Sequence, residues 1–278
     1  MAVKIITDST SDISPEIVQE LGIHVVPGYI RFGKESYQDG VDISKPGFYR
    51  QLANYPLPPV TSEASAKDFT EAYLQYQHLS EGIISIHLSS KLSRMYDSAR
   101  KGGKKAKSEW PIEIIDSGFA SIGLGLIVIN AARLANVGEN FQNIVNETNG
   151  ALKQVSMLGL FDTLKYAARG GRVTKHVMEL SGIFKIKPLL TFRDGEIVVE
   201  GLAKTYAGGI DRLFEFVSNG LRVQDAGIAY STNYDAAIDL KQRLSSVVPE
   251  DRIYVEQMGA ALGAHCGPDA IFVAIKQS

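Results

Sequence analysis

Short β-rich runs alternate with helical segments through the first half of the chain, and this alternation limits the folds that the chain can adopt. Val3–Asp8, Gly82–Leu88 and Ile112–Asp116 are rich in isoleucine, and each precedes a segment with helical periodicity. Strands that alternate with helices form parallel sheets, because each helix returns the chain to the same edge of the sheet. The sequence therefore predicts an α/β fold with a mostly parallel N-terminal sheet and flanking helices.

The pattern changes after residue 160. Residues 186–204 read as two strands joined at Asp194–Gly195, a dipeptide typical of a tight β-hairpin turn. Further strand and helix patterns follow this antiparallel element as far as the C-terminus. We therefore predict two α/β domains, residues 1–160 with a mostly parallel sheet and residues 161–278 with a mixed sheet and helices.

Charge and cysteine usage limit the partners and the compartment. The formal net charge of −2 gives no electrostatic reason to bind nucleic acid or an anionic membrane. The single cysteine, Cys266, excludes an internal disulfide and fits a reducing compartment. The first apolar run ends at Asp8, and the most apolar segment, Gly123–Ala135, is interrupted by Asn130 and Arg133. We expect a cytoplasmic protein without nucleic-acid partners or stable membrane insertion.

Clusters of serine and threonine follow the predicted strands. Thr7–Asp12, His87–Ser93 and Asp116–Ser121 stand at strand ends, and Val60–Ser65 follows a proline-rich passage. Each cluster alone is typical of helix caps. The carboxyl ends of parallel strands share one edge of a sheet, so we expect the clusters to converge there. Hydroxyl groups and helix N-terminal N–H groups together favour an anion such as a carboxylate or a phosphate.

The sequence lacks the common motifs for nucleotides, metals and serine catalysis. No G-x-x-x-x-G-K-[ST] loop or G-x-S-x-G elbow occurs, and Gly123–Leu126 lacks the third glycine of the dinucleotide fingerprint. The histidines do not have the spacing of a metal site. We therefore expect no cofactor and no metal. His265 lies in a glycine-rich segment that we predict to be a turn between strands, facing the site.

A series of motifs runs in order over nearly the whole chain: TDSTSDI, VTSEAS, LSSKLSRMYDSA, IIDS, AARGGRV, KPLLTFRDGEI and GAHCGPDAI. In this order they resemble the DegV family. The resemblance implies a two-domain α/β protein that binds a long-chain fatty acid, with its carboxylate at the domain junction and its tail buried. It also implies a partner, a dihydroxyacetone-kinase-like ATP-dependent subunit that forms the acyl phosphate. The chain itself is then a carrier subunit of a bacterial fatty acid kinase and not an enzyme.

The resemblance also implies roles for individual residues. Thr61 and Ser93 match the hydroxyls that hold the carboxylate, and Ser62 and His265 match neighbouring members of that network. Arg94 stands where the family usually has glycine, and it either pairs with the ligand head or reaches solvent. These five residues form the predicted ligand site.

Two short segments depart from the usual pattern of the family. Glu63-Ala64 replaces Gln-Pro, and Arg94-Met95 replaces Gly-Thr. Arg169 and Arg172 surround paired glycines in AARGGRV, and we predict that they dock the partner kinase.

Two other functions stay open at this point. The first is an independent hydrolase or acyltransferase that uses Ser93 or Ser117 with His265. The second is a regulatory lipid sensor. Hydrolysis of esters by the isolated chain would distinguish the enzyme from the two binding proteins.

Overall fold

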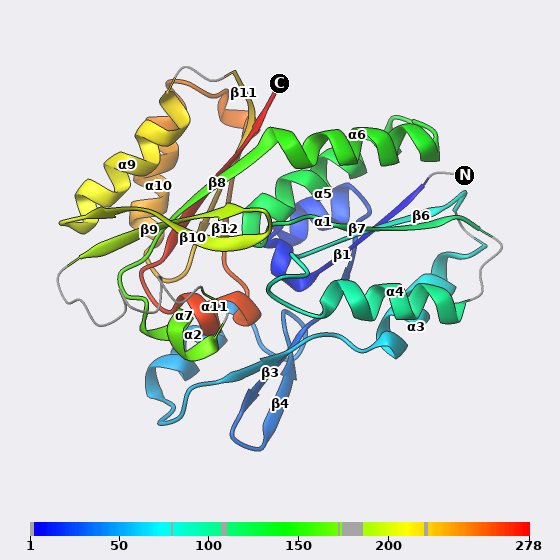
Figure 1. The fold of residues 1–278 in the computed structure, drawn as a ribbon, viewed down its shortest axis with the longest axis horizontal. Coiled ribbons are helices and arrows are strands. Elements are labelled where there is room, and N and C mark those ends of the chain that lie inside the picture. Colours follow the sequence, from blue (N-terminus) through cyan, green and yellow to red (C-terminus); the bar gives the residue numbers. More distant parts are fainter. Residues whose placement is uncertain (1–2, 79, 107–109, 172, 174–185, 220–221) are drawn as a thin grey trace.

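The first sheet of the protein consists of four parallel strands in the order β2-β1-β6-β7 (Figure 1). The structure, a computed structural model, describes residues 3–78, 80–106, 110–171, 173, 186–219 and 222–278. The central strand β6 is buried along its whole length, as expected where helices cover both faces of a sheet. The predicted parallel sheet is confirmed. Its strands are β1 (Lys4–Asp8), β2 (His24–Val26), β6 (Ile83–His87) and β7 (Ile112–Asp116).

Helices lie on both faces of this sheet (Figure 1). The first helix begins at Pro15, and the hydroxyl of Ser14 accepts the N–H of Ile17 at 3.3 Å, as the sequence predicts for a cap. The helix that begins at Ala66 starts with a capping box formed by Ser65 and Asp68. The helical elements of this half are η1 (Ser9–Ser11), α1 (Pro15–Glu20), α3 (Ala66–Tyr76), α4 (Met95–Ala106), α5 (Ser121–Asn136) and α6 (Phe141–Gln154).

Helix α5 lies between the two large sheets and contributes to both of their cores. Leu124 and Ile127 pack in the core of the first sheet, whereas Ile122 and Leu126 pack against residues of the second. Gly227 in the second sheet permits this contact, because a Cβ there would lie 2.1 Å from Ile122. Because α5 is buried against both sheets, apolar residues are found on all of its sides.

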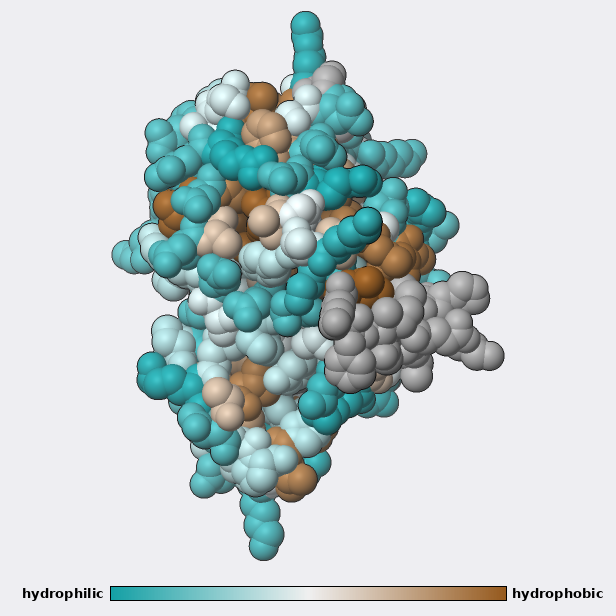
Figure 2. Space-filling model, turned by 90° about the vertical axis from the view of Figure 1, so that its left-hand side faces the viewer, coloured by the Kyte–Doolittle hydropathy of each residue, from teal (hydrophilic) through white to brown (hydrophobic). Residues whose placement is uncertain are grey.

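The described residues include no helix that is both long and apolar enough to cross a membrane. The face of the molecule in Figure 2 is largely hydrophilic, with apolar side chains in small separate groups. Scattered apolar groups of this kind are normal on a folded protein.

The second sheet is mixed and has six strands in the order β10-β9-β8-β13-β11-β12. β11 and β12 run parallel, and the other described pairs run antiparallel. Asp194 and Gly195 join β9 to β10 with φ angles of 51° and 80°, which confirms the predicted hairpin turn. The strands of this sheet and the helical elements that accompany them include β8 (Val155–Leu160), β9 (Lys187–Arg193), β10 (Glu196–Ala203), α9 (Tyr206–Ser218), β11 (Val223–Tyr230), α10 (Tyr234–Leu244), η2 (Glu250–Arg252), β12 (Ile253–Gln257) and β13 (Ile271–Gln277).

The predicted fold class is confirmed, because a parallel sheet is followed by a mixed one and both are covered by helices. β8 pairs with β13, so the second sheet begins at Val155. The division into domains between residues 160 and 161 stays a prediction.

A third, small antiparallel sheet was not predicted. β3 (Tyr29–Phe32) lies between β4 (Glu35–Gln38) and β5 (Val60–Ser62). The apolar run from His24 to Phe32 reads as one strand in the sequence, but it forms two, because proline at position 27 removes a ladder donor and the chain leaves the first sheet there. α2 (Lys45–Asn54) shares a core with this sheet.

Helix α11 (Ala260–Cys266) stands where a turn around His265 was predicted, and that prediction was wrong. Asp12 accepts the N–H of Gly259 at 2.7 Å, and Asp39 accepts the next two N–H groups of the chain at 2.8 and 3.1 Å. Carboxylates from distant parts of the sequence therefore satisfy the free donors at the start of this helix. A glycine-rich segment read alone does not reveal such partners.

Candidate ligand-binding site

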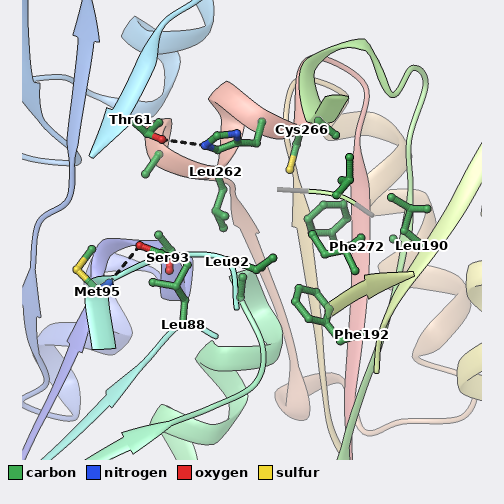
Figure 3. A pocket seen from close by; sticks show the side chains of 18 of the residues that line it. Thr61, Leu88, Leu92, Ser93, Met95, Leu190, Phe192, Leu262, Cys266 and Phe272 are labelled. Carbon is green, nitrogen blue, oxygen red and sulfur yellow. Dashed lines mark hydrogen bonds between the residues drawn. The ribbon is translucent and has the colours of Figure 1, made fainter. Parts of the chain in front are cut away.

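A single cavity joins the two halves of the molecule (Figure 3). Its walls come from β5, the loop after β6, the start of α4, and α11 on one side, and from β8, β9, β10 and β13 on the other. It contains about 1010 Å³ of space free of atoms, its open end included. Polar groups gather at one end, which we call the hydroxyl end (Thr61, Ser62, Ser93 and His265), and the opposite end is lined by apolar side chains.

A hydrogen bond between Thr61 and His265 forms one wall of the hydroxyl end. Thr61 Oγ1 and His265 Nε2 are 2.8 Å apart. β5 holds Thr61 in register with Ile30, and α11 carries the histidine. When Nε2 carries its proton, it donates to the threonine, and the threonine proton is free to be donated to an anion in the cavity. The pair thus combines two groups that are 204 residues apart in the sequence.

The hydroxyl of Ser93 serves as a helix cap and also faces the cavity. Its Oγ accepts the N–H of Met95, the first residue of α4, at 3.2 Å. A hydroxyl has one proton to donate in addition to its acceptor lone pairs, so this bond leaves the proton available for a ligand. Figure 3 shows Ser93 opposite Thr61 across the cavity. Capping and ligand binding are therefore compatible roles for the same oxygen.

Ser62 and Arg94 lie where the hydroxyl end meets solvent. Ser62 lines the cavity and is exposed. Arg94 forms an ion pair with Glu63, with Nη2 and Oε1 2.7 Å apart, and its side chain is 80% exposed. Arg94 therefore reaches solvent and also holds a neighbouring carboxylate, and its predicted contact with a ligand head stays a prediction.

The opposite end of the cavity is a continuous apolar surface. Apolar side chains from four strands of the second sheet, β8, β9, β10 and β13, line this end (Figure 3). Phe192 also contacts Phe119 of the first half, with ring centroids 5.6 Å apart. A surface of this kind suits a hydrocarbon chain, because each buried methylene gains about 0.8 kcal/mol. The lining residues of this apolar end include Met157, Phe161, Leu190, Phe192, Ile197 and Phe272.

The tip of the β9–β10 hairpin is fastened to the first half of the molecule. Ser89 Oγ donates to the carbonyl oxygen of Gly195 at 2.7 Å and accepts the N–H of Lys91 at 3.2 Å. A Cβ on Gly195 would lie 2.7 Å from the serine oxygen, and the residue has a φ of 80°. Both observations require glycine. The serine cluster His87–Ser93, read from the sequence as helix caps or anion ligands, gave no sign of this contact between the halves.

The first glycine of AARGGRV, Gly170, makes room for the histidine of the site. Helix α7 (Lys165–Gly170) packs against α11, and a Cβ on Gly170 would lie 2.0 Å from His265 Nδ1. Arg169 is exposed near the end of α7, as a docking residue must be. Arg172 lies outside the described residues.

Two buried carboxyl groups hold α11, and with it His265, in place. Asp12 also accepts the hydroxyl proton of Ser121 at 2.6 Å. Burial raises the pKa of Asp12 to about 7, although the positive charge of Lys45 opposes this shift. Burial likewise raises the pKa of Asp39. The sequence analysis read TDSTSDI as a hydroxyl cluster and did not single out these carboxyl groups.

The raised pKa of Asp12 predicts a pH-dependent stability. A buried carboxyl whose pKa is raised stabilises the fold fully below its unfolded pKa of about 4, and this contribution is lost as pH rises through 7. Asp12→Asn mimics the protonated group and removes this loss. We therefore expect the variant to gain a few kcal/mol of unfolding free energy relative to the wild type between pH 5 and pH 8, as measured by urea denaturation.

The exposed Asp239 on α10 provides the control. Asp239→Asn should show the same difference from the wild type at both pH values. A pH-independent difference for Asp12→Asn as well would mean that Asp12 stays ionised throughout this range.

The described contacts favour anion binding over serine hydrolysis. Hydrolysis needs a serine and a histidine within about 3.2 Å of each other. His265 Nε2 instead meets Thr61, and Ser93 Oγ meets a backbone N–H. Ser117 is 3% exposed, and its hydroxyl bonds to the backbone of Phe119.

A second polar chain resembles a catalytic triad but is sealed in the core. His87 Nδ1 is 2.9 Å from Asp8 Oδ2, and its Nε2 is 2.7 Å from Ser85 Oγ. All three residues are 0% exposed, and Tyr73 donates a further hydrogen bond to the serine. A substrate cannot reach this hydroxyl, so the chain serves to satisfy buried polar groups.

Comparisons with known proteins agree over the whole length of the chain. A family model described as "Uncharacterised protein, DegV family" matches residues 2–277. A DegV domain-containing protein of Caldanaerobacter subterraneus subsp. tengcongensis is 32% identical over 271 residues, 96% of each chain. Protein DegV of Bacillus subtilis is 26% identical over 278 residues, 98% of each chain.

Solved structures show the same fold. A fatty-acid-binding DegV family protein from Thermus thermophilus superposes with a TM-score of 0.92 at 26% identity, over 100% of both chains. DegV from Bacillus subtilis, a fatty acid binding protein, gives a TM-score of 0.90 at 25% identity, again over 100% of both chains.

Proposed function

The chain belongs to the DegV family, and from this premise we propose that it binds a long-chain fatty acid and presents the carboxylate to an ATP-dependent kinase subunit. The carboxylate lies at the hydroxyl end of the cavity, and the tail lies along the apolar end. The protein works in the bacterial cytoplasm as a carrier, and the dihydroxyacetone-kinase-like partner supplies the nucleotide site.

The polarity of the cavity is the observation that carries this proposal. Thr61 and Ser93 face each other at one end, and the remaining length is lined mainly by apolar side chains, among them leucine, isoleucine, methionine and phenylalanine. Burying a C16 tail contributes roughly 11 kcal/mol gross, before ordering costs. Each hydrogen bond to the charged head adds about 1.5 to 3 kcal/mol. The tail therefore supplies most of the affinity, and the hydroxyls fix the position of the head.

The position of the head suits phosphoryl transfer to a ligand that stays bound. The exposed Ser62 marks the point where the hydroxyl end opens to solvent, so a partner has access to the carboxylate there. A carboxylate oxygen attacks the γ-phosphorus of ATP, a new O–P bond forms, and the bond from this phosphorus to the β-phosphate oxygen breaks. The products are the acyl phosphate and ADP. Holding the nucleophile in place supplies much of what this reaction needs.

Replacement of Arg169 tests the carrier role together with docking. We expect native mass spectrometry of the purified protein to show about one equivalent of fatty acid, for the wild type and for Arg169→Ala alike. With partner kinase and ATP, the variant should form acyl phosphate at least about tenfold more slowly, because an exposed cation of the docking surface is lost.

Arg212→Ala removes an equally exposed arginine on α9 and serves as the matched control, with an unchanged rate expected. Equal rates for the two variants would place docking away from Arg169. Failure of the wild type to retain fatty acid or to bind added palmitate would refute the carrier role itself.

A further inference from the structure

An ion pair beside the hydroxyl end connects the two chain segments that carry the ligand hydroxyls. Glu63 follows β5, two residues after Thr61, and Arg94 directly follows Ser93. Arg94 Nη2 and Glu63 Oε1 are 2.7 Å apart. Glu63 also lines the cavity. The pair therefore stands beside the place where the proposed carboxylate lies, at the side that opens to solvent.

The two members of this pair carry opposite charges beside the proposed anion site. A carboxylate side chain such as that of Glu63 in the wall of an anion site repels the ligand, because like charges a few ångströms apart disfavour each other. The guanidinium of Arg94 offsets this repulsion. The two charges thus compensate each other.

The exposure of the ion pair and the unused donors of Arg94 allow the arginine to leave Glu63 for another anion. Its side chain is 80% exposed, whereas that of Glu63 is 22% exposed, and such solvent-facing pairs contribute little to stability. A guanidinium has five N–H donors, and the contact with Glu63 engages one end of it. A phosphoryl group offers several oxygens with a charge near −2, which suits two parallel hydrogen bonds from arginine.

Breaking the ion pair between Arg94 and Glu63 therefore costs little free energy, and binding of Arg94 to a phosphoryl dianion gains more. In the proposed function, a bound carboxylate carries one negative charge and has as partners the hydroxyls of Thr61 and Ser93, which line the cavity. A phosphoryl group added to that carboxylate extends toward solvent, past the hydroxyls. Arg94 is exposed and directly follows Ser93, so no other lysine or arginine is closer to Ser93 along the chain.

We propose that Arg94 is a phosphoryl-binding residue, which leaves Glu63 for the phosphate of a bound acyl phosphate and returns to Glu63 when the ligand is a free fatty acid. This inference rests on the proposed function, since it concerns the product of the kinase reaction. Glu63 then holds the arginine in place between turnovers. The two residues make the site favour the phosphorylated ligand over the free acid.

Hexadecyl phosphate is the probe, because it is stable and, like an acyl phosphate, combines a phosphoryl head with a long hydrocarbon tail. Palmitate is the reference ligand. Calorimetry should show that Arg94→Gln weakens binding of hexadecyl phosphate roughly tenfold to a hundredfold and weakens binding of palmitate by a smaller factor, because palmitate loses only the charge that offsets Glu63. Glu63→Gln frees the arginine and removes a repelling charge, so it should strengthen binding of hexadecyl phosphate. Lys91→Gln removes a different exposed cation from the same loop and should leave both affinities unchanged.

Each outcome of this experiment is decisive. An equal loss for both ligands in Arg94→Gln would mean that the arginine acts as a general attractive charge, and no loss for either would mean that it binds only Glu63. Both results overturn the phosphoryl role while palmitate binding by the wild type stands. A wild type that binds neither ligand would instead refute the fatty acid carrier role.

Discussion

The double variant Thr61→Val, Ser93→Ala should bind palmitate at least about a hundredfold more weakly than the wild type. Each lost hydrogen bond to the carboxylate costs about 1.5 to 3 kcal/mol, and the two losses are partly additive. Valine has the shape of threonine without its hydroxyl, so the wall of the cavity is preserved. Calorimetric titration of protein stripped of ligand gives the affinities.

Hexadecanol separates the loss of anion binding from the loss of structure. This alcohol has the same tail and no charged head, so its affinity should change far less than that of palmitate. Ser93→Ala also removes the acceptor for the N–H of Met95, and we expect a stability loss of about 1 kcal/mol. Ser90→Ala, an exposed serine on the same loop, should alter neither affinity. An unchanged palmitate affinity in the double variant, with a lowered melting temperature, would leave Ser93 as a cap alone.

Affinity should rise steeply with the length of the fatty acid. Laurate and palmitate differ by four methylenes, each of which adds about 0.8 kcal/mol when it enters an apolar site, so palmitate should bind roughly two hundredfold more tightly. The expectation follows from the apolar end of the cavity, which Leu190, Phe192 and Phe272 line (Figure 3).

The double variant at the hydroxyl end offers an internal check on this series. Its affinities should be lower for every acid, yet the gain per methylene should be the same, because the tail contacts are untouched. A flat series from C12 to C16 in the wild type would mean that the tail does not lie in the cavity.

The sequence was most informative where structure depends on neighbouring residues. The isoleucine-rich runs predicted the parallel strands, and Asp194–Gly195 predicted a hairpin turn that has positive φ at both residues. Ser14 and Pro15 predicted the start of α1. In each case the deciding interaction spans only a few positions of the chain, so a pattern of residue types is sufficient.

Prediction failed where the deciding partner is distant in the sequence. α11 starts where it does because Asp12 and Asp39 accept its first N–H groups, and those residues are more than 200 positions away. The pairing of Glu63 with Arg94 also depends on which loops meet in space.

For the site, the family resemblance suggested which residues bind the ligand, and the structure shows where those residues lie. The resemblance proposed Thr61, Ser93 and His265, and the structure brings the first and last within 2.8 Å and places all three in the wall of one cavity. The role of Gly170 in packing against the histidine had no sequence signal, since a glycine pair is equally typical of an exposed turn.

Because α5 belongs to both cores, we expect the two halves of the molecule to unfold as one cooperative unit. Swinging them apart about a hinge would bring Ile122 and Leu126 into water, at a cost of about 1.5 to 3 kcal/mol for each side chain. A smaller movement at the rim of the cavity costs less. β10 is the edge strand of its sheet, and Ser89 holds the tip of its hairpin through one hydrogen bond. Under the proposed function, local opening at this hairpin would set the residence time of the fatty acid, so that a carrier holds its cargo tightly without being slow to release it.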